Sequence, residues 1–155
     1  MSSEISQGAI RTSVDDRGVA RLTISRPEKM NALDTEATLG IKAAMEEWGN
    51  RDDVRVIVID GKGGSFSAGA DVVSINRQAG ANGASGLDPT QARGIISAGS
   101  ELARAVRSVP VPVVASVDGP AAGIGASLAL ASDLIYATRR SYFLLAFINI
   151  GLMPD

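Results

Sequence analysis

Two glycine-rich turns, each directly after an apolar strand-like run, are the parts of this sequence best suited to chemistry. The stretch 113–131 reads as a buried strand, a turn containing Gly119, Gly123 and Gly125, and a helix that is apolar on nearly every face. Such a turn leaves the first N–H groups of the helix without intrahelical partners, at the positive end of the helix dipole. Those groups can bind an anion, either a phosphate or an oxyanion that forms only during a reaction. A tight connection inside a packed α/β domain is the alternative, and this stretch alone leaves it open.

The second turn spans residues 61–71 and follows an almost continuous β-branched run at 54–60. A run of this composition predicts a strand buried on both faces of a parallel sheet. The two turns can therefore lie at the same edge of one small sheet. The second turn has neither the G-x-x-x-x-G-K-[ST] pattern of a phosphate-binding loop nor the G-x-G-x-x-G pattern of dinucleotide sites. Its sequence 65–69 is close to a G-x-S-x-G elbow, but a serine hydrolase also needs a histidine.

The composition excludes several classes of function. Histidine and cysteine are absent from the 155 residues, which removes thiolate catalysis, disulfides, Cys/His metal sites and any Ser-His-Asp triad within this chain. A formal net charge of −2 argues against nucleic acid as the main partner. No apolar run approaches the ~20 residues that cross a bilayer, and no signal-like segment is present. We expect a cytoplasmic, soluble protein with one domain, since 45% hydrophobic residues suffice for a core.

Hydrophobic periodicity predicts the elements that position the two turns. Period-two alternation indicates strands, and spacings of three and four indicate helices. The predicted elements are a hairpin (8–14 and 19–25), a helix from Asp34 or Thr35 to about Asn50, a strand (54–60), a helix (90–108), the strand and helix of 113–131, and a strand (133–137).

Two segments are predicted to lie outside regular structure. Residues 1–7 are small and polar, as in a frayed terminus. Residues 76–89 are small, polar and glycine-rich, and too long for a simple connector, so they form either a mobile lid or a disordered insertion.

Four motifs follow one another along the chain. They are Arg26-Pro27-Glu28-Lys29-Met30-Asn31-Ala32-Leu33, Phe66-Ser67-Ala68-Gly69-Ala70-Asp71, the stretch 119–133, and Gly151-Leu152-Met153-Pro154-Asp155. Their order and spacing resemble the enoyl-CoA hydratase/isomerase (crotonase) superfamily over essentially the whole chain from about Gly8. The resemblance implies an α/β fold, a crotonase-like ββα spiral core over residues 8–155. Typical members carry further C-terminal helices that complete the acyl pocket and build trimers, so we expect a truncated member that lacks this helical part.

The resemblance also implies a chemistry and its residues. The family binds acyl-CoA thioesters and stabilises an enolate, and the backbone N–H groups of Ala70 and Ile124 would form the oxyanion hole. Removing one such donor typically costs ~10²–10³ in rate. The positions matched to CoA-binding positions are Ala68, Asp71 and Val72, with Lys29 and Arg26 as neighbours of the CoA phosphates. No cofactor is implied beyond the CoA of the substrate, and a homotrimer or dimer of trimers is expected if the C-terminal part is present.

Departures from the family pattern bear on the reaction. Hydratases of this family use two glutamates, and the matching positions here are Ser127 and Phe147. Adding water requires activating the water and protonating carbon, and neither carboxylate is present to do so. Asp155 lies where some isomerases and a dehalogenase of the superfamily carry a working aspartate, and one carboxylate suffices for a 1,3-proton shift. We therefore expect an enoyl-CoA isomerase, most similar to those of the phenylacetate-degradation type.

Other interpretations stay open at this point. An enoyl-CoA hydratase is the second candidate activity, and a non-catalytic CoA-binding member or an inert fragment is the third. Asp155 can instead cap a helix after Pro154 or simply end the chain. A dehalogenase-like nucleophilic role for Asp155 is disfavoured because that chemistry also uses a histidine.

Overall fold

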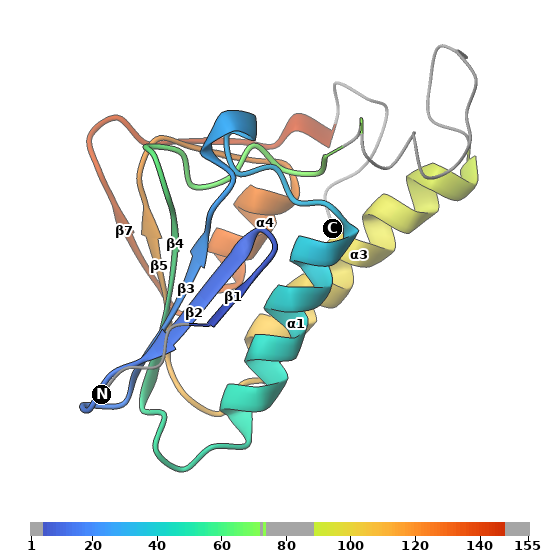
Figure 1. Cartoon of the computed structure of the whole chain (residues 1–155). Helices are drawn as coiled ribbons and strands as arrows, with labels where there is room; N and C mark the ends of the chain where they lie inside the picture. Colours follow the sequence, from blue (N-terminus) through green and yellow to red (C-terminus); the bar gives the residue numbers. More distant parts are fainter. Residues whose placement is uncertain (1–4, 72, 74–88, 148–155) are drawn as a thin grey trace.

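A six-stranded sheet is the scaffold of the molecule (Figure 1). The computed structural model describes residues 5–71, 73 and 89–147. The sheet strands, in spatial order, are β1 (Ile5–Gln7), β2 (Ile10–Val14), β3 (Val19–Ile24), β4 (Val56–Gly61), β5 (Val113–Val117) and β7 (Leu134–Ala137). β1, β2 and β3 pair antiparallel, whereas β3, β4, β5 and β7 pair parallel. Two short strands, β6 (Pro120–Ala122) and β8 (Tyr142–Leu144), pair parallel in a second sheet.

The hairpin of β2 and β3 confirms the predicted one and is closed by its turn chemistry. The Asp15 carboxylate accepts hydrogen bonds from the N–H groups of Arg17 at 3.0 Å and Val19 at 2.9 Å. Gly18 adopts a φ of 80°, a conformation that glycine takes without steric cost. The turn therefore sets the register that places Leu22 of β3 in the core.

The helices lie against one face of the sheet. They are α1 (Thr35–Gly49), α3 (Pro89–Ser108) and α4 (Ile124–Ala131), with a short 3-10 helix η1 (Pro27–Lys29) before α1. Asp34 caps α1 as predicted, because its carboxylate accepts from the Ala37 N–H at 2.8 Å. Apolar residues at helical spacing, from Ala37 through Ile41 to Trp48, form a stripe of α1 that is buried.

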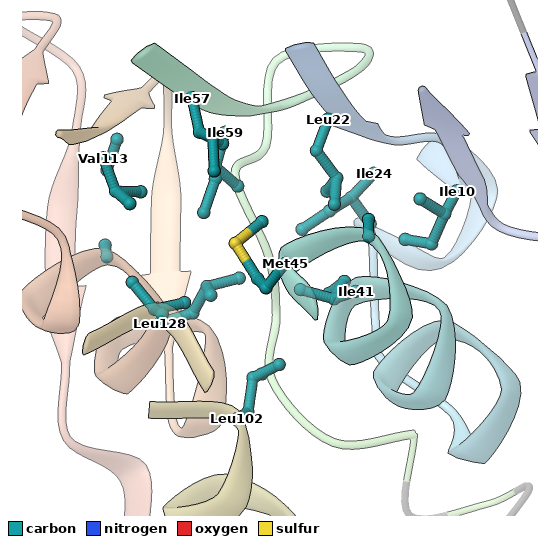
Figure 2. Packing of buried hydrophobic residues seen from close by; sticks show 14 of the residues in the cluster. Ile10, Leu22, Ile24, Ile41, Met45, Ile57, Ile59, Leu102, Val113 and Leu128 are labelled. Atoms are coloured by element: carbon teal, nitrogen blue, oxygen red, sulfur yellow. The ribbon is translucent and has the colours of Figure 1, made fainter. Parts of the chain in front are cut away.

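The hydrophobic core fills the space between this face and the helices. Figure 2 shows side chains of β3, β4 and β5 meeting those of α1, α3 and α4. Its labelled members are Ile10, Leu22, Ile24, Ile41, Met45, Ile57, Ile59, Leu102, Val113 and Leu128. The helices thereby fix where both glycine-rich turns leave the sheet.

The prediction that β4 is buried on both faces was wrong. Ile57 and Ile59 are fully buried, but Val56 and Val58, which alternate with them, are only half-buried. The reason is that the described helices cover one face of the sheet, so the other face carries only partly shielded residues. A β-branched composition indicates that a strand forms, but it does not indicate whether one or both faces of that strand are covered.

Three short strands were not predicted. Ile5–Gln7 forms β1 within the segment expected to be frayed, because the edge of β2 offers it backbone partners. β6 lies inside the predicted turn of 113–131, and β8 lies in the apolar stretch after β7. The predicted lid or insertion at 76–89 falls outside the described residues except for Pro89, which begins α3. Within the described part of the chain, no helix is long and apolar enough to cross a membrane.

The packing of α1 predicts the response to a truncated side chain. Ile41 is 0% exposed, so Ile41→Ala should lower the free energy of unfolding by about 2–5 kcal/mol through lost burial and the cavity left behind. Leu39 on the same helix is 58% exposed, and Leu39→Ala should change it by less than about 0.5 kcal/mol. Urea unfolding measures both, and equal losses for the two variants would contradict this account of the core.

Candidate active site

The end of the second glycine-rich turn is held between two neighbouring segments. On one side, the Ala68 N–H donates to the Met30 carbonyl at 2.9 Å. On the other side, the Ser67 N–H donates to the Pro120 carbonyl at 3.1 Å, and the Ala122 N–H donates to the Ser67 carbonyl at 2.8 Å. The turn is therefore sandwiched between the segment after η1 and strand β6.

These backbone bonds determine where the Ala70 N–H points. The Leu33 N–H donates to the Gly69 carbonyl at 2.7 Å, and the Asp71 N–H donates to the Leu33 carbonyl at 2.8 Å. In the trans, planar peptide that joins Gly69 to Ala70, the C=O and the N–H point in opposite directions. Because the Gly69 carbonyl faces Leu33, the Ala70 N–H points away from Leu33, toward β6 and α4.

The Ile124 N–H lies near the Ala70 N–H and comes from the glycine-rich turn of the stretch 113–131. Gly123 is the N-cap of α4 and Ile124 its first residue, so this N–H has no intrahelical acceptor. The turns touch closely: a Cβ on Gly69 would lie 2.7 Å from the Ala122 carbonyl oxygen, and one on Gly123 would lie 3.9 Å from the Gly69 Cα. The contact brings Ala70 and Ile124 together. No hydrogen bond from either N–H is found within the described part of the chain.

Both residues line one cavity of about 250 Å³, which lies beside α1, α3 and the start of α4. Its walls include the apolar side chains of Leu33, Leu39 and Ala98. Two N–H donors beside an apolar cavity form an environment in which an oxygen that gains negative charge is stabilised strongly. The arrangement can therefore act as an oxyanion hole.

An ion-pair network joins the two segments that orient the Ala70 N–H. The Arg26 guanidinium donates to the Ala32 carbonyl at 2.8 Å and pairs with the carboxylates of Asp34 at 2.9 Å and Asp71 at 3.0 Å. The Lys29 ammonium also donates to Asp71, at 2.9 Å. The Arg26 and Asp71 side chains are 13% and 5% exposed. Arg26 therefore links the segment after η1 to the end of the second glycine-rich turn. The backbone hydrogen bonds between these two segments orient the Ala70 N–H.

The structure brings together several residues that the sequence nominates for CoA binding. Arg26, Lys29 and Asp71 meet in this network, where the charges of Arg26 and Asp71 are already paired. The Lys29 side chain is 43% exposed and half-buried Ala68 lies in the sandwiched turn, so both remain beside the surface. Val72 and the predicted acid–base residue Asp155 lie outside the described residues.

Asn31 is a site residue whose role sequence reasoning missed. Its side chain is fully buried, accepts from the Arg26 N–H at 2.8 Å, and donates to the carbonyls of Lys62 at 2.8 Å and Ser65 at 2.6 Å. Its φ of 57° is one that asparagine tolerates better than most residues. Asn31 thus joins the start of the second glycine-rich turn to η1. Its place between Pro27 and Leu33 in the first motif was the available signal.

Ser67 has a structural role in place of a nucleophilic one. Its hydroxyl donates to the Asn31 carbonyl at 2.9 Å and accepts from the Gly69 N–H at 3.1 Å. α4 packs so closely that a Cβ on Gly125 would lie 2.6 Å from the Ser67 Cβ. The buried hydroxyl is therefore committed to holding the turn.

A surface ion pair links the two glycine-rich turns. Asp118, just before the first turn, pairs with Arg140, and hydrogen bonds from Arg140 and Thr138 lower the pKa of Asp118 to about 2. A Cβ on Gly64 of the second turn would lie 2.8 Å from an Arg140 guanidinium nitrogen. Arg140 thus covers the second turn while it binds the start of the first.

The positions matched to the two hydratase glutamates carry no acid. Ser127 lies one turn after Ile124 on α4, and its N–H donates to the Gly123 carbonyl at 3.1 Å. Phe147 is 4% exposed and belongs to the core. Glu101 on the cavity wall is paired with Lys42, whose hydrogen bond holds the pKa of Glu101 below its usual range. This carboxylate is therefore a poor base.

The ion-pair network of Arg26 predicts that replacing this residue by an uncharged side chain will destabilise the protein. Arg26→Gln should lower the free energy of unfolding by about 3 kcal/mol, because it removes the charged Arg26 partner of the buried Asp71 carboxylate. Arg51 pairs with Asp53 at the surface, and Arg51→Gln should cost less than about 1 kcal/mol. Chemical denaturation compares the two variants. Losses of the same size would show that the Arg26 network stabilises no more than a surface pair.

Known proteins are similar to this chain in sequence and in fold. The family model described as enoyl-CoA hydratase/isomerase matches residues 15–155. The chain is 38% identical to a probable enoyl-CoA hydratase of Rhodobacter capsulatus, covering 97% of this chain and 54% of that protein. It is 32% identical to the 1,2-epoxyphenylacetyl-CoA isomerase of Escherichia coli, covering 90% of this chain and 52% of that protein.

A solved structure shows the same fold. The crystal structure of an enoyl-CoA hydratase from Mycobacterium avium subsp. paratuberculosis superposes with a TM-score of 0.80 at 38% identity, covering 97% of this chain and 55% of that one. The chain thus spans about half the length of the relatives it matches. Because the family match extends over both glycine-rich turns and the parallel strands that carry them, the chain belongs to the enoyl-CoA hydratase/isomerase (crotonase) family.

Proposed function

We propose that this protein binds an acyl-CoA thioester in the cavity and shifts a carbon–carbon double bond through an enolate, with Asp155 as the single acid–base group. The observation that carries the proposal is the convergence of the Ala70 and Ile124 N–H groups on one apolar cavity. As the enolate forms, the thioester oxygen gains negative charge. Donors already aimed at that oxygen stabilise the charge without reorganising.

The residues at the two positions matched to the hydratase glutamates favour isomerisation over hydration. Serine at 127 and phenylalanine at 147 leave no carboxylate pair to activate water and protonate carbon. In the direction from a 2-enoyl to a 3-enoyl thioester, the Asp155 carboxylate removes a proton from C4 and the electrons move to the thioester oxygen. The protonated Asp155 then returns the proton to C2, and the reverse reaction follows the same steps.

A hydratase is the second candidate, and the similarity to the probable enoyl-CoA hydratase of Rhodobacter capsulatus favours it. The similarity to the 1,2-epoxyphenylacetyl-CoA isomerase of Escherichia coli supports the isomerase and, within it, the phenylacetate-degradation type. A homotrimeric assembly belongs to the same proposal. The exposed apolar side chains of β7 and β8, among them Tyr136 and Phe143, support it.

The products formed from two substrates distinguish the candidates. The protein is incubated with 2-enoyl-CoA and, separately, with 3-enoyl-CoA, and the products are identified by chromatography with mass detection. We expect the double bond to move without any gain in mass. Rapid formation of 3-hydroxyacyl-CoA would contradict the isomerase in favour of the hydratase, and CoA binding without turnover would favour a non-catalytic member.

Removing the acid of Asp155 tests its assigned role. Asp155→Asn should slow isomerisation by ~10²–10⁴-fold, the usual contribution of a positioned acid–base group, while leaving the affinity for CoA nearly unchanged. The matched control is Asp52→Asn in an exposed turn, which should retain the wild-type rate. A rate for Asp155→Asn equal to that of this control would remove Asp155 from the mechanism.

A further inference from the structure

The cavity that contains the two N–H groups extends as a groove between two helices. α1 and α3 lie side by side in Figure 1. The lining residues are Thr35, Thr38, Leu39 and Lys42 on α1, with Gly94, Ala98 and Glu101 on α3. Residues three, four or seven positions apart share one face of a helix, so each helix lines the groove along about two turns.

The walls of this groove suit hydrocarbon. A Cβ on Gly94 would meet none of the described atoms within 4 Å, so the described part of the chain leaves open space at this position of α3. Leu39 presents an apolar side chain that is 58% exposed. The Thr38 hydroxyl, by contrast, is used internally, since it donates to the Asp34 carbonyl at 2.9 Å. Hydrocarbon that enters the groove therefore covers apolar surface and leaves no polar group of Thr38 without a partner.

The groove has two chemically different ends. At one end, Leu33 pairs with Ala70 just before α1 begins at Thr35. Lys42 lies seven residues further along α1, roughly 10 Å away at the rise of an α-helix. There the Lys42 ammonium forms an ion pair with the Glu101 carboxylate of α3, which connects the two helices.

This ion pair opposes the passage of a hydrocarbon chain. The Lys42 and Glu101 side chains are 32% and 53% exposed, so both charges are hydrated. The hydrogen bond from Lys42 is the main cause of the lowered pKa of Glu101, which favours the charged form of this carboxylate. A longer apolar chain must either separate the two charges or displace their water, and both are unfavourable.

We infer that the acyl chain of the substrate lies in the groove between α1 and α3, and that the Lys42–Glu101 pair sets the longest chain that fits. The inference rests on the proposed thioester site, because it places the carbonyl at the N–H groups of Ala70 and Ile124. It adds a limit on the length of the acyl group. Lys42 and Glu101 are thus specificity-determining residues that take no part in the proton transfer.

Binding of unreactive substrates tests this inference without any need for turnover. CoA and saturated acyl-CoAs from acetyl- to palmitoyl-CoA are titrated into the protein by calorimetry. For the wild type, affinity should rise by up to about fourfold per added methylene while the chain fills the groove, and then stop rising. In the double variant Lys42→Met, Glu101→Leu, the rise should continue, giving about tenfold tighter binding of the first chains beyond the wild-type limit.

Two further variants separate the groove from general effects of charge and packing. Ala98→Leu fills the groove from α3 and should weaken binding of long acyl-CoAs while leaving acetyl-CoA unchanged. Glu47→Leu with Arg51→Met removes an ion pair of the same kind at the end of α1, outside the groove, and should keep the wild-type length limit.

The outcomes that overturn the inference differ from those that overturn the proposed function. An unchanged length limit in the Lys42→Met, Glu101→Leu variant, or an affinity in the wild type that does not depend on chain length, would overturn the inference and leave the thioester site intact. If the wild type binds neither CoA nor any acyl-CoA, the proposed function falls, and the inference falls with it.

Discussion

The close backbone contact between Gly69 and the Ala122–Gly123 peptide is the constraint on which the candidate site depends. A Cβ on Gly69 would lie 2.7 Å from the Ala122 carbonyl oxygen, and Gly69 has a φ of 94°, so only glycine fits there without displacement. The contact brings two N–H groups from turns far apart in sequence to one cavity. Because the donors are backbone atoms, the side chains at positions 70 and 124 can vary without removing them.

Polar side chains, more than apolar ones, hold this contact in place. Asn31 and Ser67 are 0% exposed, and their polar side-chain groups hydrogen-bond to backbone groups of the second turn and of the segment around η1. Arg26 and Asp71 add a buried ion pair across the same segments. A buried polar group without a partner is costly, so these side chains permit few alternative arrangements of the turn. The site is consequently specified by hydrogen-bond geometry, whereas the core beneath it is specified by burial.

Periodicity predicted the hairpin, α1 and α3, because each is long enough to repeat its pattern of burial, whereas short apolar runs predicted β5 and β7. It could not predict β6 and β8, which have three residues each and depend on each other for pairing, and the proline that opens β6 argues against a strand. The family motifs led to Ala70 and Ile124. They gave no indication that Arg26 would pair with Asp71, which lies 45 positions away in sequence. Spacing along the chain carries no information on such a pairing.

The placement of the site separates electrostatic stabilisation from proton transfer. The proposed oxyanion hole consists of backbone N–H groups fixed by Gly69, whereas any acid or base must come from side chains such as those at 127, 147 and 155. A substitution at those positions can therefore change the reaction without moving the hole. Relatives named as a hydratase and as an isomerase match the same chain over 97% and 90% of its length, which agrees with the proposed separation. In the proposed mechanism, the backbone of the fold stabilises negative charge on oxygen, and side chains decide where the proton goes.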